Sequence, residues 1–227
     1  MPRRDHEAWN EEMARRYNPD AFLNKSGFFI RSVGFLRLAA AERALDSGSK
    51  DTVLDLGCGP GHLLERLRGA SIIGVDLSDT LLEMARQRVR HRPEVQVVKA
   101  DAEHLPYPDN HFDRIVCSEV LEHVVDPAAV LKEIHRVAKP GMRVVLTVPN
   151  EGLINATKRV VLALGVKKWI AGGYDMSDDM LNQWHRAEIG VDWIMEHARG
   201  KFELIRSRGV PLSMLAYHRV LAFRVVK

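Results

Sequence analysis

The sequence of 227 residues is 46% hydrophobic and 28% charged, and its formal net charge at pH 7 is +3. This balance is typical of a globular protein with a substantial core and excludes global disorder. The small positive charge falls short of the dense Lys and Arg patch that nucleic-acid binding usually requires, so a nucleic-acid partner is not indicated.

Cysteine usage and the N-terminal sequence favour a cytoplasmic protein. Cys58 and Cys117 are the only cysteines, and both fall in or beside predicted strands, which argues against a disulfide framework or a thiolate metal site. The first 17 residues are charged and lack the apolar region of a secretory signal. No apolar run approaches the roughly 18 to 20 residues of a membrane span.

Residues 1 to about 50 are expected to form a helical cap. A core over residues 51–150 follows, in which short Val- and Ile-rich strands alternate with helical periodicity, the pattern of a parallel sheet covered by helices on both faces. Ser78 and Asp126 have the residue types that cap helices, and Pro127 suits a first helical position. The expected strands are TVLDLG, SIIGVD, VQVVKA, FDRIVCS and MRVVLTV, and the expected helices PGHLLERLRGA, SDTLLEMARQRVRHR and DPAAVLKEIHRVAKPG.

Two further regions complete a single predicted domain over residues 1–227. Residues 151–197 are expected to form a helical lid inserted over the core. Residues 198–227 contain two strand-like runs, KFELIRSRG and MLAYHRVLAFRVVK, separated by Gly209 and Pro211. These runs can pair as an antiparallel edge on the parallel sheet.

The stretch VLDLGCGPG places three glycines at alternate positions directly after a predicted buried strand. The turn from a strand into a helix points free backbone N–H groups at one spot, and glycine lets a ligand approach them. The spacing G-x-G-x-G differs from the dinucleotide fingerprint, and no G-K-[ST] follows to complete a Walker A loop. At this point a tight turn that binds no ligand remains an alternative.

Four motifs in register resemble the class I S-adenosylmethionine-dependent methyltransferases. VLDLGCGPGHL resembles that family's first motif and GVDLS its second; KADAEHLPYPDNHFDRIVCSEVLEHVVDP and VLKEIHRVAKPGMRVVLTVPN follow in the family's order and spacing. The resemblance covers residues 50–150 well, the final strands weakly and the N-terminal region hardly at all. It implies a Rossmann-like three-layer α/β sandwich, with a mostly parallel seven-stranded sheet, an antiparallel last strand and a helical cap.

The resemblance also implies S-adenosylmethionine as cofactor and assigns residues to it. Asp55 would accept a hydrogen bond from the methionine ammonium, Asp76 would bind the ribose hydroxyls, and Asp101 would bind the adenine amino group. Alone, Asp76 or Asp101 reads equally well as a solvated loop carboxylate or a cap. The other positions expected at the cofactor are the backbone of Gly57, Gly59 and Gly61, the ring-lining Leu77 and Ala102, Glu119, and Tyr17, which with Trp9 is a candidate for an aromatic lid.

The segment SEVLEHV places Glu119, Glu122 and His123 at positions i, i+3 and i+4, which lie on one face of a helical turn. It resembles the E-x-x-E-H metal motif of the ubiquinone-biosynthesis O-methyltransferases and of the small-RNA 2′-O-methyltransferases. There a later histidine completes the site, and His185 is the candidate here. The implied ion is Mg²⁺, acting as a Lewis acid on a hydroxyl, and the mix of imidazole and carboxylate would also suit Mn²⁺, Fe²⁺ or Zn²⁺. The alternative has no metal, with Glu119 near the cofactor and His123 packed or acting as a base; His123 and His185 are the catalytic candidates.

The acceptor is expected to be a small lipophilic or aromatic hydroxylated molecule, with O-methylation favoured. Residues 158–169 form a basic, partly amphipathic segment that suits a lid over the active site or, as an alternative, contact with a membrane surface. An RNA 2′-O-methyltransferase and a non-catalytic regulatory or assembly protein that binds S-adenosylmethionine are the other functions left open. The sequence does not set the oligomeric state.

Overall fold

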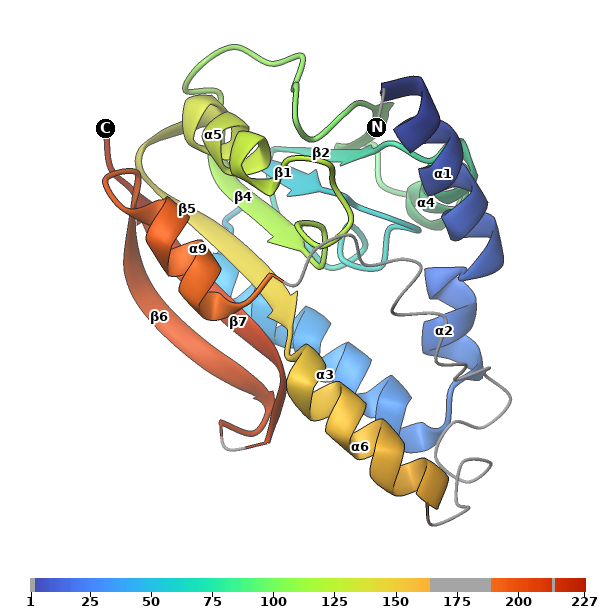
Figure 1. The fold of residues 1–227 in the computed structure, drawn as a ribbon. Helices are drawn as coiled ribbons and strands as arrows, with labels where there is room; N and C mark the ends of the chain where they lie inside the picture. Colours follow the sequence, from blue (N-terminus) through green and yellow to red (C-terminus); the bar gives the residue numbers. More distant parts are fainter. Residues whose placement is uncertain (1–2, 164–188, 214) are drawn as a thin grey trace.

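A seven-stranded sheet in the order β3-β2-β1-β4-β5-β7-β6 forms the centre of the computed structural model (Figure 1). The structure describes residues 3–163, 189–213 and 215–227. Strands β3, β2, β1, β4 and β5 are parallel, whereas β7 is antiparallel to β5 and to β6. The predicted fold class is therefore confirmed. The strands are β1 Thr52–Leu56, β2 Ser71–Asp76, β3 Val95–Lys99, β4 Phe112–Ser118, β5 Ala138–Pro149, β6 Phe202–Pro211 and β7 Ala216–Val225.

Helices cover both faces of this sheet. In Figure 1, α5 and α9 lie in front of the strands and α3 lies behind them, while α1 and α2 run along one side. The helices are α1 Arg3–Arg16, α2 Pro19–Lys25, α3 Phe28–Leu45, α4 Asp79–Val89, α5 Pro127–Val137, α6 Glu151–Ala163 and α9 Val191–Ala198. No helix within the described ranges has both the length and the apolar content to cross a membrane.

The central strands are buried on both faces because their neighbouring side chains alternate between two hydrophobic clusters. Val53 and Val116 pack into one cluster with residues of α3 and α4. Leu54 and Ile115 pack into the other with residues of α5 and α9. This alternation explains why the buried parts of β1 and β4 have consecutive apolar residues, VL in β1 and IVC in β4, as is typical of parallel sheets.

Two of the predicted helix starts are confirmed by their caps. The side chain of Ser78 accepts a hydrogen bond from the backbone N–H of Leu81 at 3.2 Å. The side chain of Asp126 accepts from the N–H groups of Ala128 and Ala129 at 3.0 and 3.1 Å, and Pro127 is the first residue of α5. These side chains satisfy N–H groups that have no partner within the helix.

The helix expected over PGHLLERLRGA is wrong, since residues 61–66 form successive turns. The leucines at helical spacing are buried, so the spacing reflects burial rather than a continuous helix. A long side chain intervenes: the guanidinium of Arg92 donates hydrogen bonds to the carbonyls of Leu64 and Leu67 at 2.5 and 2.7 Å. Because these two carbonyls accept from a side chain rather than from later backbone N–H groups, no helix continues past Leu67.

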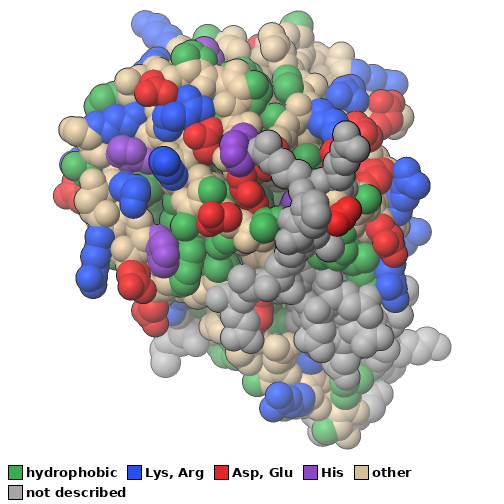
Figure 2. All heavy atoms as spheres, turned by 45° about the horizontal axis from the view of Figure 1, so that its top comes forward, with side chains coloured by type: hydrophobic (Ala, Val, Ile, Leu, Met, Phe, Trp, Pro, Cys, Tyr) green, Lys and Arg blue, Asp and Glu red, His purple; other side chains and the backbone are tan. Residues whose placement is uncertain are grey.

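The lid segment is described only in part. Helix α6 buries Val161 and leaves Val160 57% exposed, and Lys158, expected on a basic surface, is only 7% exposed. Residues 164–188, which include the rest of the expected lid and His185, lie outside the described residues. On the face shown in Figure 2, Lys and Arg side chains are interspersed with Asp and Glu among the described residues.

Replacing Asp126 with Ala removes both cap hydrogen bonds from the start of α5. We expect the free energy of unfolding to fall by about 1 kcal/mol, within the usual range of roughly 0.5 to 2 kcal/mol for a lost N-cap. Asp126→Asn, which keeps an acceptor oxygen, should lose only part of this. Urea unfolding of the three proteins measures the difference; equal loss in both variants would show that the cap acts through its charge alone.

Candidate active site

A cavity of about 430 Å³ lies where the loops after β1, β2 and β4 meet the end of β5 and the start of β7. Helices α1, α2, α3 and α6 contribute its other walls. Its volume falls within the range of roughly 300 to 1,000 Å³ usual for small-molecule sites. The sequence-predicted residues that line it are Tyr17, Asp55, Gly57, Gly59, Asp76, Leu77, Asp101, Ala102, Glu119, Glu122 and His123.

The glycine loop folds back onto β2 and takes a left-handed backbone at its glycines. The N–H groups of Gly57 and Cys58 donate to the carbonyl of Val75 at 2.7 and 2.9 Å. Gly57 has φ +72° and leaves no room for a side chain, because a Cβ there would lie 2.3 Å from Cγ2 of Val120. Gly59 has φ +51° and nothing within 4 Å of a Cβ, so its open side faces the cavity.

Gly61 differs from the other two glycines because it does not line the cavity. Its φ is +82°, and a Cβ would lie 3.1 Å from the backbone of Ala85 in α4. The structure therefore shows Gly61 allowing close packing between the loop and α4. The cofactor contact expected of its backbone stays a prediction.

Asp55 is an almost fully buried acidic residue of the cavity wall. It is 1% exposed, and its Oδ2 has no hydrogen-bond partner among the described residues. Burial, with a smaller contribution from the charge of Asp76, raises the pKa of Asp55 to about 8. A buried carboxylate without a partner is costly, so this position suits a ligand that brings a positive charge or a hydrogen-bond donor.

Asp76 ends β2 and is held by the glycine loop and the start of α4. Its Oδ2 accepts from the N–H of Gly59 and its Oδ1 from the N–H of Ser78, both at 2.9 Å. Burial still raises the pKa of Asp76 above its ordinary value despite these hydrogen bonds. A carboxylate has about four lone-pair sites, so Asp76 can accept further hydrogen bonds from a ligand.

Asp101 and Ala102 line the cavity beyond the end of β3. Oδ1 of Asp101 accepts from the N–H of Glu103 at 2.9 Å. Asp101, Glu103 and His104 are also the only group within the described residues whose ligand atoms lie close enough together to hold a metal ion. This group of side chains is partly exposed and is separate from the metal set predicted from SEVLEHV.

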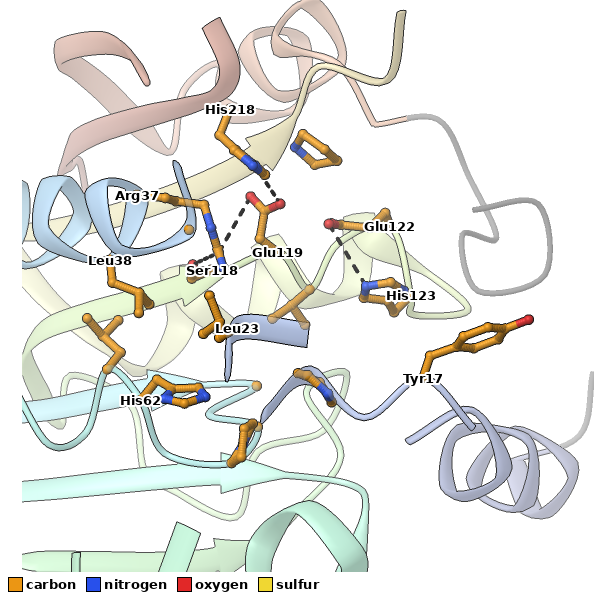
Figure 3. A pocket seen from close by; sticks show the side chains of 18 of the residues that line it. Tyr17, Leu23, Arg37, Leu38, His62, Ser118, Glu119, Glu122, His123 and His218 are labelled. Atoms are coloured by element: carbon orange, nitrogen blue, oxygen red, sulfur yellow. Dashed lines mark hydrogen bonds and ion pairs between the residues drawn. The ribbon is translucent and has the colours of Figure 1, made fainter. Parts of the chain in front are cut away.

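Glu119 joins four other polar side chains at the same edge of the sheet, and Figure 3 shows three of them, Arg37, Ser118 and His218. Its Oε1 accepts from the hydroxyl of Thr147 at 2.8 Å, its Oε2 lies 2.9 Å from Nδ1 of His218, and Arg37 lies 3.8 Å from Oε1. Arg37 also donates to the hydroxyl of Ser118 at 2.8 Å. Burial raises the pKa of Glu119, but the charges of His218 and Arg37 and the hydrogen bonds outweigh it, so this pKa lies well below its ordinary value.

The predicted arrangement of SEVLEHV is wrong, because residues 119–125 form turns and Glu119 has φ +57°. Glu122 is buried, and its Oε2 has no partner among the described residues. Its Oε1 lies 4.0 Å from Nε2 of His123, as drawn in Figure 3. Burial, and then the charge of Glu119, raises the pKa of Glu122 well above its ordinary value. The three side chains do not form a compact ligand group, and the metal set that includes His185 stays a prediction.

Three residues that line or brace the site carried no signal in the sequence. Arg37 lies within the helical cap, His218 lies in the last strand, and Glu11 lies in α1. Glu11 accepts hydrogen bonds from the hydroxyls of Ser78 and Thr80 and so fastens α1 to the start of α4. Burial raises the pKa of Glu11, but these hydrogen bonds outweigh it and lower the value to about 2.

A family model described as a methyltransferase domain matches residues 54–146. This match and the motifs support a class I S-adenosylmethionine-dependent methyltransferase. This region contains the glycine loop, Asp76, Asp101 and Glu119, so the matched segment and the cavity wall coincide. The family's cofactor is S-adenosylmethionine, which agrees with the chemistry of the cavity.

Individual methyltransferases extend this finding. A ubiquinone biosynthesis O-methyltransferase of Pseudomonas aeruginosa is 42% identical over 119 residues, which cover 48% of this chain and 48% of that protein. A demethylmenaquinone methyltransferase of Clavibacter sepedonicus is 29% identical over 191 residues, or 79% of this chain and 77% of that protein. The chain spans about a third to a half of most of the curated relatives that head the comparison.

The fold extends beyond the matched segment. A putative methyltransferase of Haloferax volcanii, solved in complex with the Trm112 methyltransferase activator, superposes with a TM-score of 0.69. The two chains are 15% identical, and the alignment covers 98% of each. At this identity the likeness shows the fold alone, and among the described residues that fold includes the cap helices and the closing strands.

Gly59→Ala tests whether the open side of the glycine loop receives the donor. Gly141, with φ +73° and nothing within 4 Å of a Cβ, provides a matched control outside the cavity. Both variants should lose roughly 1 to 2 kcal/mol of unfolding free energy through left-handed strain. Only Gly59→Ala should weaken S-adenosylhomocysteine binding, by tenfold or more in calorimetry. Equal affinities in the two variants would show that the glycine loop is not part of the donor-binding site.

Asp55→Asn tests the unpaired carboxylate. Between about pH 4 and 8, Asp55 stays protonated in the folded protein but is ionised in the unfolded chain. The free energy of unfolding therefore falls as the pH rises through this window. Asp55→Asn should therefore gain unfolding free energy relative to the wild type across this window, by about 1 kcal/mol or more at pH 8. The variant should also lose the thermal stabilisation by S-adenosylmethionine.

Asp113→Asn serves as the opposite control for Asp55→Asn. Hydrogen bonds from Lys139 and Thr52 lower the pKa of Asp113 against the effect of burial. Replacing Asp113 with Asn should lower the free energy of unfolding. The size of this loss should be constant above about pH 5, where the carboxyl group is ionised in both the folded and the unfolded protein. Parallel pH dependences in the two variants would contradict the assignment of Asp55.

Proposed function

We propose that this protein transfers the methyl group of S-adenosylmethionine to a hydroxyl group of a small lipophilic or aromatic acceptor. The observation that carries the proposal is the shared cavity. One end has the family's donor-binding carboxylates and glycine loop, and the remainder is walled by apolar side chains of α2, α3 and α6. These side chains are Leu23, Ile30, Val33, Ile154 and Val161, with Phe29 at the rim.

The residues present fit the donor. The unpaired Oδ2 of Asp55 suits the ammonium group, and the open face of Gly59 gives a backbone surface without a side chain. When bound, the donor supplies a methyl group whose bonding pair stays on sulfur as the acceptor oxygen forms the new carbon–oxygen bond. The protein must then orient the acceptor, exclude water and accept the hydroxyl proton.

Two further observations support a small acceptor. The relatives named for ubiquinone biosynthesis and for demethylmenaquinone methylation act, by those names, on small molecules. The face shown in Figure 2 mixes both signs of charge among the described residues, whereas an RNA-binding groove needs clustered Lys and Arg. A cytoplasmic location remains part of the proposal.

The proposal does not use a divalent cation. Both oxygens of Glu119 already interact with donors, Thr147 on one side and His218 on the other. Whether the protein binds the predicted Mg²⁺ is therefore tested separately. Metal analysis of protein purified without chelators, with and without Glu122→Ala, combined with the response of turnover to EDTA, decides it.

A survey with tritium-labelled S-adenosylmethionine tests the function directly. Phenols and catechols, lipids, primary amines and unmodified RNA are offered in parallel, and label extracted with each class is counted. We expect label in the phenol or catechol arm, and none in any arm for Asp55→Asn, because that variant lacks the donor site. Label in the RNA or amine arm alone would overturn the acceptor class. Donor binding without transfer to any class would favour a regulatory protein.

A further inference from the structure

His218 reaches the cavity because of the direction of the last strand. Strand β7 is antiparallel to β5, so its beginning lies beside the end of β5, where His218 pairs with Pro149 in the register. The carboxyl edge of the sheet thus receives a residue from near the C-terminus. The side chain of His218 is 18% exposed and lines the same cavity as Asp55 and the glycine loop.

The hydrogen bonds around Glu119 fix the direction of each proton. Arg37 can only donate, so Ser118 accepts from it at 2.8 Å and directs its own proton to Thr147 at 2.9 Å. Thr147 then donates to Oε1 of Glu119 at 2.8 Å. Every proton in this series of hydrogen bonds points toward the carboxylate of Glu119. The carboxylate is therefore the ionised acceptor at the end of the series.

The ionised carboxylate fixes the tautomer of His218. Oε2 of Glu119 lies 2.9 Å from Nδ1, so Nδ1 carries the proton. In the neutral ring Nε2 then holds the free lone pair. A carboxylate that holds an imidazole in one tautomer and stabilises its charged form is the arrangement by which a histidine serves as a base.

We propose that His218 is the general base of the transfer, with Glu119 as its positioning residue. This inference rests on the proposed function. Nε2 accepts the proton that the acceptor hydroxyl loses, and the bond changes at the methyl group are those given above. The imidazolium is stabilised by Glu119 and releases the proton to water after the product leaves.

Other ionisable groups line the same cavity. Arg37 comes from α3, Glu122 and His123 from the turn after β4, Lys158 from α6, and Tyr217 from β7 beside His218. Glu119 is the only acidic group within ion-pair distance of His218 among the described residues. The ring therefore responds first to Glu119, whose replacement by Gln also removes the ion pair with Arg37.

A spectroscopic experiment tests the dyad without an acceptor. Long-range proton–nitrogen NMR of ¹⁵N-histidine-labelled protein at about pH 9 reports the tautomer of each neutral ring, and the signals lost in His218→Gln identify His218. We expect protonated Nδ1 in the wild type and a shift toward protonated Nε2 in Glu119→Gln. Protonated Nε2 in the wild type would overturn the proposal.

Kinetics then separate a base from a structural ion pair, using the acceptor identified by the methyl survey. His218→Gln should bind S-adenosylhomocysteine as the wild type does but lose roughly 10²- to 10⁴-fold in kcat, the range for general-base catalysis. The acid limb of its pH profile should disappear, and added imidazole should restore part of the rate. His135→Gln, whose ring contacts the Val226 carbonyl on the surface, is the matched control and should leave kcat unchanged.

The failures of the two proposals are distinguishable. No binding of S-adenosylhomocysteine to the wild type would refute the proposed function, whatever the tautomer of His218. Normal donor binding with undiminished turnover in His218→Gln would refute only the base. If the survey finds no acceptor, the tautomer measurement alone supports or overturns the dyad.

Discussion

The cavity depends on the parallel order of β1, β2, β4 and β5, which forces the loops after these strands to meet at one edge of the sheet. These loops leave an open space between them because the loop after β1 has glycines, which lack side chains, at its turns. A Cβ at position 57 would collide with the side chain of Val120, so either the turn or Val120 would have to move. The left-handed glycines are therefore the local condition under which the carboxylates of Asp55 and Asp76 border a common space.

Much of this edge is predictable from the sequence because its signals are local. Buried parallel strands are continuous apolar runs, helix caps lie within three residues of the N–H groups they satisfy, and the glycine loop directly follows its strand. Asp55, Asp76 and Asp101 each stand at or just beyond a strand end, so their convergence follows once the strand order is known. The order itself is seen only in the structure, because the resemblance to a known family implied a mostly parallel sheet with an antiparallel last strand but no strand order.

Other parts depend on contacts between residues far apart in the chain. His218 meets Glu119 through the register of β7 on β5, across 99 positions, and Arg37 meets Ser118 through packing of α3, across 81 positions. Neither residue stands in a recognisable local pattern. The expected helix after the glycine loop is wrong for a similar reason, since the side chain that takes its carbonyls comes from Arg92. Hydrophobic spacing predicts which face is buried, but not which distant donor ends an element.

The opposite environments of Glu119 and Glu122 explain why proton transfer fits this site better than the predicted metal set. Donors surround Glu119 and keep it ionised, whereas Oε2 of Glu122 has none, and the neighbouring negative charge further disfavours its ionisation. A divalent ion bound by both residues would compete with Thr147 and His218 for the oxygens of Glu119 and would have to remove a proton from Glu122. A base at His218 requires neither change, because Glu119 already holds the charge that an imidazolium needs. Two glutamates three residues apart thus differ in charge because one lies beside the last strand and the other does not.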